Sequence, residues 1–243
     1  TVFRDLSFGC VAGSVMLVTG ANGSGKSSLL RVLAGLVACD GAIRWNGVPI
    51  AEDWTTHLHY VGHLDALKPE LTVAEMLDYW RALMGESPSR TCGLPSLKLR
   101  QGLVLGRAEA LAKAERGQGG GRFSYKPNFG LCGTRPTPTP SHEVWEGDSP
   151  LQPDPFDLEK LQHKHTRILS AGQKRRLSLS RLLLREAPLW LLDEPTTALD
   201  SAGQKILSAM LMHHRARGGI SIIAAHHALD VPDVTVLEMP EAA

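Results

Sequence analysis

The chain of 243 residues carries 26 lysines and arginines against 25 aspartates and glutamates, for a formal net charge of +1. So balanced a charge provides no electrostatic footprint for nucleic acid or an anionic membrane surface, and no nucleic-acid partner is expected. A hydrophobic content of 43% suffices for a full globular core, and the four cysteines form neither a Cys-x-x-Cys pair nor a metal-ligand spacing, which indicates a reduced, cytosolic protein.

A glycine-rich loop is the first motif along the chain, between a predicted strand at 15–18 and a predicted helix from Ser28. It completes the pattern G-x-x-x-x-G-K-[ST] with Gly20, Ala21, Asn22, Gly23, Ser24, Gly25, Lys26 and Ser27. Such glycines let backbone N–H groups cradle phosphate oxygens, and the helix N-terminus attracts the same anion. We expect Lys26 to reach the β- and γ-phosphates of a nucleotide and Ser27 to ligate Mg²⁺. The alternative is a glycine turn before an ordinary helix, and the complete match with its flanks argues against it.

The next segments predict a small antiparallel sheet beside the nucleotide fold. Asn46-Gly47 lies between two short apolar runs and is a strong hairpin signal.

A short buried strand is predicted next, at residues 58–62. The run Thr72-Val73-Ala74-Glu75 forms a capping box, and the apolar spacing after it predicts an amphipathic helix that ends near Met84.

Residues 87–155 differ in composition from the rest of the chain. Nine of the 15 prolines lie there, and only 103–115 could form a helix. This composition cannot bury enough apolar surface to offset the entropy of ordering, so we expect a partly disordered insert. The chain is thereby divided into a first part of the core at 1–86, the insert at 87–155, and a second part of the core at 156–243.

Two polar motifs follow the insert. Ser170 and Gln173 form a second capping box, so a serine hydroxyl and free N–H groups stand at a helix N-terminus and make a second potential anion site. A predicted buried strand at 189–192 then delivers Asp193 and Glu194 at its carboxyl end, the end at which open α/β sheets bind ligands. By itself a strand ending in Asp-Glu is usually structural.

The remaining elements are predicted as a helix to about Arg217 and strands at 220–224 and 234–237. The first of these strands leads into His226 and His227. A lone histidine after a strand more often belongs to the core or the surface than to a site.

The order of the motifs resembles that of ABC-type ATPases. The quoted stretches are Gly20 to Ser27, Leu169 to Gln173, Leu191 to Pro195, Ala198 to Asp200, and His226. The resemblance implies an α/β fold, with a P-loop NTPase core, a small antiparallel β subdomain, and an atypical helical subdomain that contains the insert. It also implies a homodimer in which two chains enclose two ATP molecules.

The resemblance further implies roles at matching positions. Asp193 looks like the acidic residue near Mg²⁺, Glu194 like the general base, and His226, with His227 as the alternative, like the histidine that contacts the γ-phosphate. The residues that look like contacts to ATP across the dimer are Ser170, Gly172, Gln173 and Asp200.

Within the ABC ATPases, the chain most resembles the haem exporter ATP-binding subunits of bacterial cytochrome c biogenesis. These subunits are similar to this chain in having His at the position of His63, where most ABC ATPases have Gln. This resemblance covers roughly 1–85 and 156–238. It implies an ATP hydrolase that powers haem export for c-type cytochrome maturation together with transmembrane subunits, as a peripheral protein on the cytoplasmic face of the inner membrane. The apolar runs agree with this location, because they are far shorter than the ~20 residues that cross a bilayer.

Two other functions remain open at this point. The insert lies where ABC ATPases of DNA maintenance carry a coiled coil, but its glycine and proline content and its lack of apolar heptads oppose that function. A regulatory or hydrolysis-defective nucleotide binder is the second alternative.

Overall fold

The computed structural model describes residues 3–50, 52–84, 154–226 and 229–240, which all belong to one compact unit. The predicted helix at 103–115 and His227 lie outside these residues, as does nearly all of the predicted insert. The strands are β1 (Val15–Thr19), β2 (Arg44–Trp45), β3 (Val48–Pro49), β4 (Leu58–Val61), β5 (Leu189–Asp193), β6 (Ile220–Ala224) and β7 (Thr235–Glu238). The α-helices are α1 (Lys26–Leu33), α2 (Val73–Leu83), α3 (Ala171–Ser180) and α4 (Ser201–Ala216), and the short 3₁₀ helices are η1 (Glu52–His57), η2 (Glu159–Leu161), η3 (Thr166–Ile168) and η4 (Arg181–Leu183).

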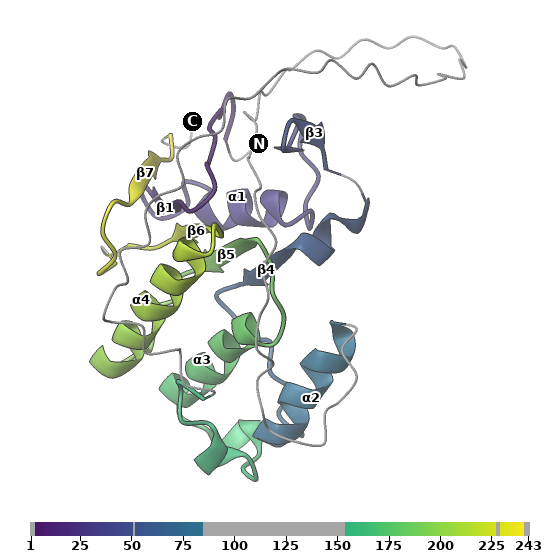
Figure 1. Cartoon of the computed structure of the whole chain (residues 1–243), viewed down its shortest axis with the longest axis vertical. Coiled ribbons are helices and arrows are strands. Elements are labelled where there is room, and N and C mark those ends of the chain that lie inside the picture. Colours follow the sequence, from purple (N-terminus) through teal and green to yellow (C-terminus); the bar gives the residue numbers. More distant parts are fainter. Residues whose placement is uncertain (1–2, 51, 85–153, 227–228, 241–243) are drawn as a thin grey trace, which may run out of the picture. The chain divides into compact units, whose positions relative to one another are not determined.

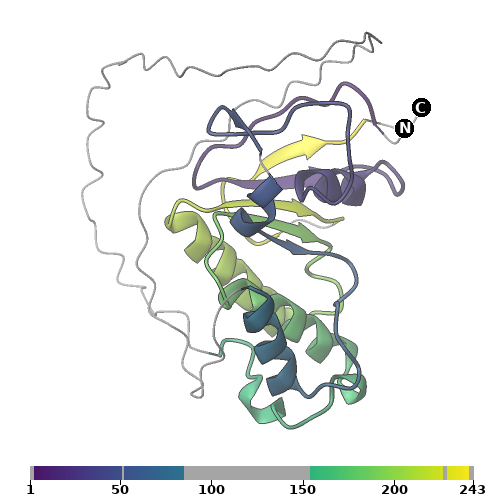
Figure 2. The same cartoon turned by 90° about the vertical axis from the view of Figure 1, so that its right-hand side faces the viewer.

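A parallel sheet in the order β4-β5-β6-β1-β7 is the centre of the fold (Figures 1 and 2). Its register pairs Val61 with Leu192, Asp193 with Ala224, and Ala224 with Val18. The carboxyl ends of β4, β5, β6 and β1 therefore meet along one edge. Every segment that follows these ends is delivered to the same place, which is where ligands bind in sheets of this kind.

Strands β1, β5 and β6 are buried on both faces, and successive side chains of β1 pack into different clusters. In β1, Val15 and Leu17 belong to the cluster with α2, α3 and α4, whereas Met16 and Val18 belong to the cluster with α1. This alternation follows from the two-residue period of a strand. It explains why these strands read as continuous apolar runs, as expected for a parallel sheet covered on both sides.

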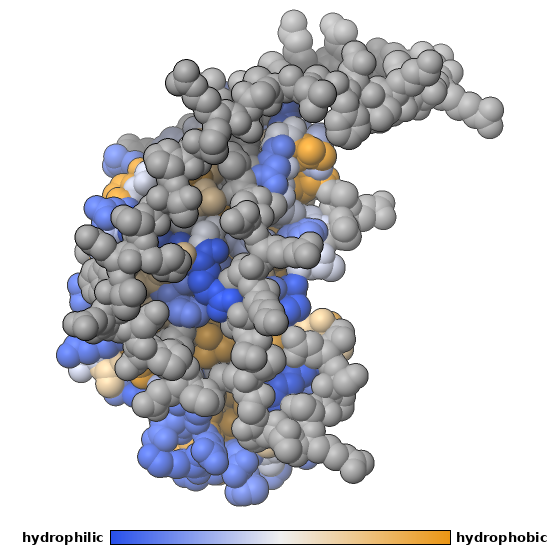
Figure 3. Space-filling model, viewed as in Figure 1, coloured by the Kyte–Doolittle hydropathy of each residue, from blue (hydrophilic) through white to orange (hydrophobic). Residues whose placement is uncertain are grey.

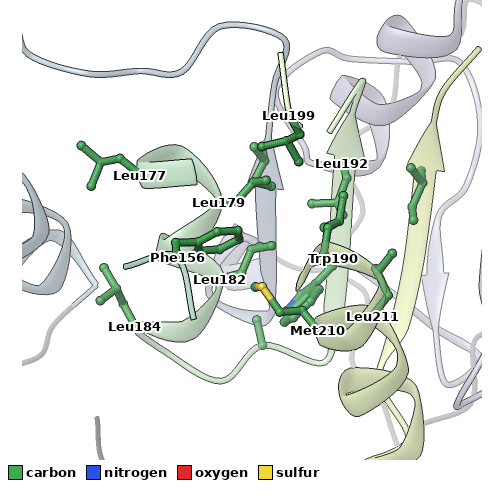
Figure 4. Close-up of a cluster of buried hydrophobic side chains, with 14 of the residues drawn as sticks. Phe156, Leu177, Leu179, Leu182, Leu184, Trp190, Leu192, Leu199, Met210 and Leu211 are labelled. Carbon is green, nitrogen blue, oxygen red and sulfur yellow. The ribbon is translucent and has the colours of Figure 1, made fainter. Parts of the chain in front are cut away.

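The larger cluster joins the second half of the chain to the sheet (Figure 4). Phe156 is 2% exposed and packs with leucines of α3 and η4, Trp190 and Leu192 of β5, and Met210 of α4. Fully burying one such side chain contributes about 1.5–3 kcal/mol. Phe156 is therefore part of the core that α3, β5 and α4 share.

The predicted hairpin is present as β2 and β3. Asn46 and Gly47 have φ values of 53° and 77°, the left-handed pair that a type I′ turn requires. Trp45 packs edge-on against Trp54, with ring centroids 5.1 Å apart, and the Trp54 indole donates a 2.7 Å hydrogen bond to the Leu33 carbonyl at the end of α1. The small antiparallel sheet is therefore fastened to the helix that follows the glycine-rich loop.

Both predicted capping boxes are confirmed, at Thr72 with Glu75 and at Ser170 with Gln173. Among the described residues, no helix is long and apolar enough to cross a membrane. Figure 3 shows an apolar area over β3, where Val48 is 65% exposed.

Candidate functional site

The glycine-rich loop connects β1 to α1 and encloses its own lysine. The ammonium of Lys26 donates hydrogen bonds to the carbonyls of Gly20 (2.8 Å) and Ala21 (2.9 Å), and the residue is only 7% exposed. Gly20 has a φ of 140°, and a Cβ there would lie 2.8 Å from Oγ of Ser24. The loop therefore requires glycine at this position to close around the lysine.

Two features of this loop suit an anion. α1 begins at Lys26, so the first N–H groups of the helix have no partner within it. Oγ of Ser24 is buried and has no hydrogen-bond partner among the described residues. Buried polar groups normally have hydrogen-bond partners. A phosphate oxygen bound in the loop could accept from the Ser24 hydroxyl and from the N–H groups of α1.

The hydroxyl of Ser27 donates a 2.9 Å hydrogen bond to Oδ1 of Asp193, which links the start of α1 to the end of β5. Asp193 is 1% exposed, and its second oxygen, Oδ2, has no hydrogen-bond partner within the described ranges. Nδ1 of His63 lies 3.8 Å from Oδ2, which is too long for a hydrogen bond. One buried carboxylate oxygen is therefore available to a ligand.

Glu194 leaves β5 with a φ of 50°, a left-handed conformation that costs about 1–3 kcal/mol outside glycine. Its N–H donates a 2.8 Å hydrogen bond to the carbonyl of Ala224, at the end of β6. Oε1 of Glu194 lies 3.3 Å from Nε2 of His226, an ion pair whenever the imidazole is protonated. The sheet register thus brings the acidic end of β5 next to the histidine that follows β6.

The structure therefore gathers six of the predicted site residues at one edge of the sheet. They are Lys26, Ser27, His63, Asp193, Glu194 and His226. Asn22, Gly23 and Gly25 belong to the same loop, with positive φ at both glycines.

The other predicted site residues make a separate, locally bonded group around the N-termini of α3 and α4. Ser170 and Gln173 hydrogen-bond each other. Asp200 caps α4 by accepting from Gly203 N–H, and Nη2 of Arg176 donates to both of its oxygens, at 2.6 and 2.7 Å. The Arg176 hydrogen bonds lower the pKa of Asp200 below its usual value.

Gly172 has a packing reason to be glycine, because a Cβ there would lie 2.9 Å from the carbonyl oxygen of Ala198. This contact fits the start of α3 against the loop before α4. The geometry within one chain thus accounts for the glycine.

Arg175 is a site neighbour that the sequence analysis missed. It is almost fully buried on α3, and it donates to the backbone carbonyls of Asp193 (2.8 Å) and Glu194 (2.7 Å). The available signal was position, because Arg175 precedes the buried Leu179 by four residues and Leu182 by seven, and so stands on the apolar face of its helix.

The geometry can be set beside known proteins. The profile of the ABC transporter family matches residues 3–197. The chain belongs to this family.

Three relatives, each called cytochrome c biogenesis ATP-binding export protein CcmA, align with nearly all of this chain. The one from Paramagnetospirillum magneticum is 37% identical, over 100% of this chain and 88% of the relative. Those from Rhodospirillum rubrum and Bradyrhizobium diazoefficiens are each 36% identical, over 98% and 95% of this chain and 79% and 86% of the relatives.

Solved structures agree with the ABC transporter fold. An ATP-binding subunit of an ABC transporter superposes with a TM-score of 0.62 at 22% identity, covering 93% of this chain and 73% of that one. A putative ABC transporter ATP-binding protein from Pyrococcus furiosus gives 0.59 at 20% identity, covering 99% and 97%. The predicted α/β P-loop NTPase class is confirmed, as is the resemblance to the ATP-binding subunits of cytochrome c biogenesis. As an ABC transporter protein with this phosphate loop, the chain binds ATP.

Proposed function

We propose that this chain is the ATP-hydrolysing subunit of an ABC transporter that powers haem export or delivery for the maturation of c-type cytochromes. The relatives support the pathway through their names, which specify ATP binding, export and cytochrome c biogenesis. The observation that carries the chemistry is the assembly of Lys26, Asp193 and Glu194 at one edge of the sheet.

ATP would bind with its phosphates in the loop of residues 20–27. Lys26 supplies positive charge there, and the N–H groups at the start of α1 supply donors. The residues present also fit a Mg²⁺ ion, because Ser27 and Asp193 offer only oxygen atoms and one of these oxygens is buried without a hydrogen bond. When bound, Mg²⁺ neutralises negative charge on the phosphate oxygens during transfer. His63, beside Asp193, stands where most ABC ATPases have Gln.

Glu194 would act as the general base, accepting a proton from the water that attacks the γ-phosphate. Its carboxylate is one residue beyond Asp193, so it is close to the phosphates without being required as a metal ligand. His226 holds a position next to Oε1 of Glu194 and would contact the γ-phosphate itself.

The second group of residues would act in trans. Ser170, Gly172, Gln173 and Asp200 bond locally within one chain, which is consistent with a surface that completes its role only against a second copy. A homodimer would enclose two ATP molecules, each between the phosphate loop of one chain and α3 of the other. Transmembrane subunits of the same transporter would receive the resulting movement, with this chain bound peripherally on the cytoplasmic face of the inner membrane.

The test combines hydrolysis with the cellular product. The chain purified with its membrane partners should hydrolyse ATP, and Glu194→Gln should still bind ATP while losing at least ~10²-fold in turnover, the usual effect of removing a general base. In cells that lack the native gene, the wild-type chain should restore covalently haem-bound cytochromes and Glu194→Gln should not. Unchanged hydrolysis in Glu194→Gln would refute the catalytic assignment, and full cytochrome maturation without the chain would refute the pathway.

A further inference from the structure

Every N–H donor of the Arg175 guanidinium has an acceptor close to the site. The residue is 3% exposed, and a guanidinium has five N–H donors in a fixed planar arrangement. Its acceptors are the backbone oxygens of Gly62 (2.9 Å), Asp193 (2.8 Å), Glu194 (2.7 Å) and Pro195 (3.4 Å), together with Oδ1 of Asp65 (3.3 Å). A buried arginine so fully satisfied fixes the positions of the groups that accept from it.

Two of these acceptors, together with the Ala224 carbonyl of β6, determine the direction of the Glu194 side chain. The carbonyl of Asp193 belongs to the peptide plane before Glu194, and the carbonyl of Glu194 belongs to the plane after it. Ala224 holds the first plane from its other side, by accepting the Glu194 N–H. Because the two planes set φ and ψ, they also set where the Cβ points. The left-handed conformation at Glu194 is therefore held in place by Arg175 and β6 together.

The other end of the guanidinium holds the segment after β4. Nη1 donates to the carbonyl of Gly62 and to Asp65, which lie on either side of His63 in the chain. The carboxylate of Asp65 is also the charged partner of Arg175, since no other ion pair of this arginine is found among the described residues. One side chain of α3 thus connects the segments that carry His63 and Glu194.

We propose that Arg175 is a positioning residue for ATP hydrolysis, which holds the Glu194 carboxylate in its reactive direction from the helix that begins at Ser170. The inference rests on the proposed role of Glu194 as general base. Among the described residues, Arg175 makes no hydrogen bond to the phosphate loop or to Lys26, so its loss should reduce turnover and leave ATP binding nearly unchanged.

Arg181 provides a control, because it is a partly buried arginine at the end of α3. It donates to the carbonyl of Tyr60 in β4, and its guanidinium lies 5.8 Å from the Trp80 ring. Burial lowers its pKa to about 10. Among the described residues, the hydrogen bond and the ring contact of Arg181 do not involve the Glu194 turn, so Arg181→Lys measures what the loss of a partly buried guanidinium does to this region in general.

The experiment compares Arg175→Lys, Arg181→Lys and Glu194→Gln in the purified transporter. Lysine keeps the charge but has a single donor group that cannot reach acceptors on both sides. We expect Arg175→Lys to lower kcat by about 10- to 100-fold, as displacement of a reacting group by about 1 Å can do, with KM for ATP within about threefold. Arg181→Lys should keep kcat within about twofold. Asp65→Ala, which removes the charged partner without removing the arginine, should lower kcat by a smaller factor.

Two further measurements separate positioning from general destabilisation. If Arg175 acts through Glu194, then Arg175→Lys added to Glu194→Gln should lower the residual turnover by less than about twofold. In the nucleotide-free protein, the amides of Glu194 and Thr197, which bond Ala224 O and Glu194 O, should exchange with deuterium faster in Arg175→Lys and not in Arg181→Lys.

The outcomes are distinguishable. Normal kcat in Arg175→Lys, equal losses in Arg175→Lys and Arg181→Lys, or a full additional loss on top of Glu194→Gln would each overturn the inference while leaving the role of Glu194 intact. Unchanged turnover in Glu194→Gln would instead remove the general base from the proposed function, and the positioning role with it. If Arg175→Lys does not fold, Asp65→Ala with the exchange measurement decides the question.

Discussion

Ser27 and Asp193 lie 166 positions apart in the chain, yet the serine hydroxyl donates a 2.9 Å hydrogen bond to the aspartate. This bond joins the helix after the phosphate loop to the end of β5, which lies two strands away from β1 in the sheet. It uses Oδ1 and leaves Oδ2 buried without a hydrogen bond among the described residues. Burying a carboxylate with only one hydrogen bond lowers the stability of the folded chain. A cation bound to the second oxygen would offset this loss.

We therefore predict opposite effects of Asp193→Asn on stability and on metal-dependent binding. Replacing the carboxylate by a neutral amide should raise the free energy of unfolding of the nucleotide-free chain by about 1–2 kcal/mol, because a poorly paired buried charge is removed. Chelating Mg²⁺ should weaken ATP binding to the wild-type chain, and it should make little difference to Asp193→Asn. Denaturant titration and fluorescent-nucleotide binding measure the two effects. A destabilised Asp193→Asn whose ATP affinity still depends on Mg²⁺ would contradict this account.

A mixed dimer tests whether α3 acts in trans. Lys26→Ala should inactivate the phosphate loop, and Ser170→Arg should block the N-terminus of α3. Because a mixed dimer contains one site with an intact lysine and an intact serine, mixing the two inactive chains should restore part of the hydrolysis. Differently tagged subunits confirm that mixed dimers have formed. Activity no greater than that of either variant alone, in confirmed mixed dimers, would mean that each chain completes its own site.

The pH dependence of stability should be governed by two buried histidines away from the site. His59 bonds the carbonyl of Arg185 at 2.7 Å, and His214 stacks on Trp190 with ring centroids 3.9 Å apart. Burial lowers the pKa of both to about 4. Since the unfolded chain takes up protons at about 6.5, the stability from these neutral rings is fully present above that pH and is lost as pH falls toward 4. The loss is on the order of 3 kcal/mol for each histidine.

The measurement is the free energy of unfolding between pH 7.5 and pH 4.5. His214→Phe keeps an aromatic ring against Trp190 but cannot take up a proton, so the slope between about pH 6 and pH 4.5 should fall by about 1.4 kcal/mol per pH unit, with little change above about pH 6.5. His163→Gln changes an exposed histidine and serves as the control. An unchanged slope in His214→Phe would show that His214 does not titrate on unfolding.

Local signals and motif order predicted much of this protein, since capping boxes, the Asn-Gly turn and strand-end motifs are encoded within a few residues. The rule that parallel strands present ligands at their carboxyl ends then placed Asp193, Glu194 and His226 together. The network of Arg175 was missed because it joins α3 to two segments far away in the chain. The left-handed Glu194 was also missed, because its conformation depends on those tertiary contacts and has no signal in its own residue type.

The predicted insert lies almost wholly outside the described residues. All the phosphate-loop and acidic residues gathered at the edge of the sheet lie outside it, between positions 20 and 63 or between 193 and 226. Replacing residues 87–150 with about 20 glycine and serine residues, which span about 25 Å on average, should therefore preserve the fold and ATP affinity. The shorter loop should change stability by only about 1 kcal/mol, because closure entropy changes by about 0.6 kcal/mol for each doubling of length.

The effect should appear in coupling to the membrane partners, because the segment lies between α2 and α3, in the part of the fold that resembles the helical subdomain of ABC ATPases. We expect the shortened chain to bind ATP like the wild type and to restore less covalently haem-bound cytochrome in cells. Nucleotide affinity measured on the purified chain and haem staining of the cells separate the two. Loss of nucleotide binding in the shortened chain would show that residues 87–150 belong to the nucleotide core, and the domain boundary at 86 would then be wrong.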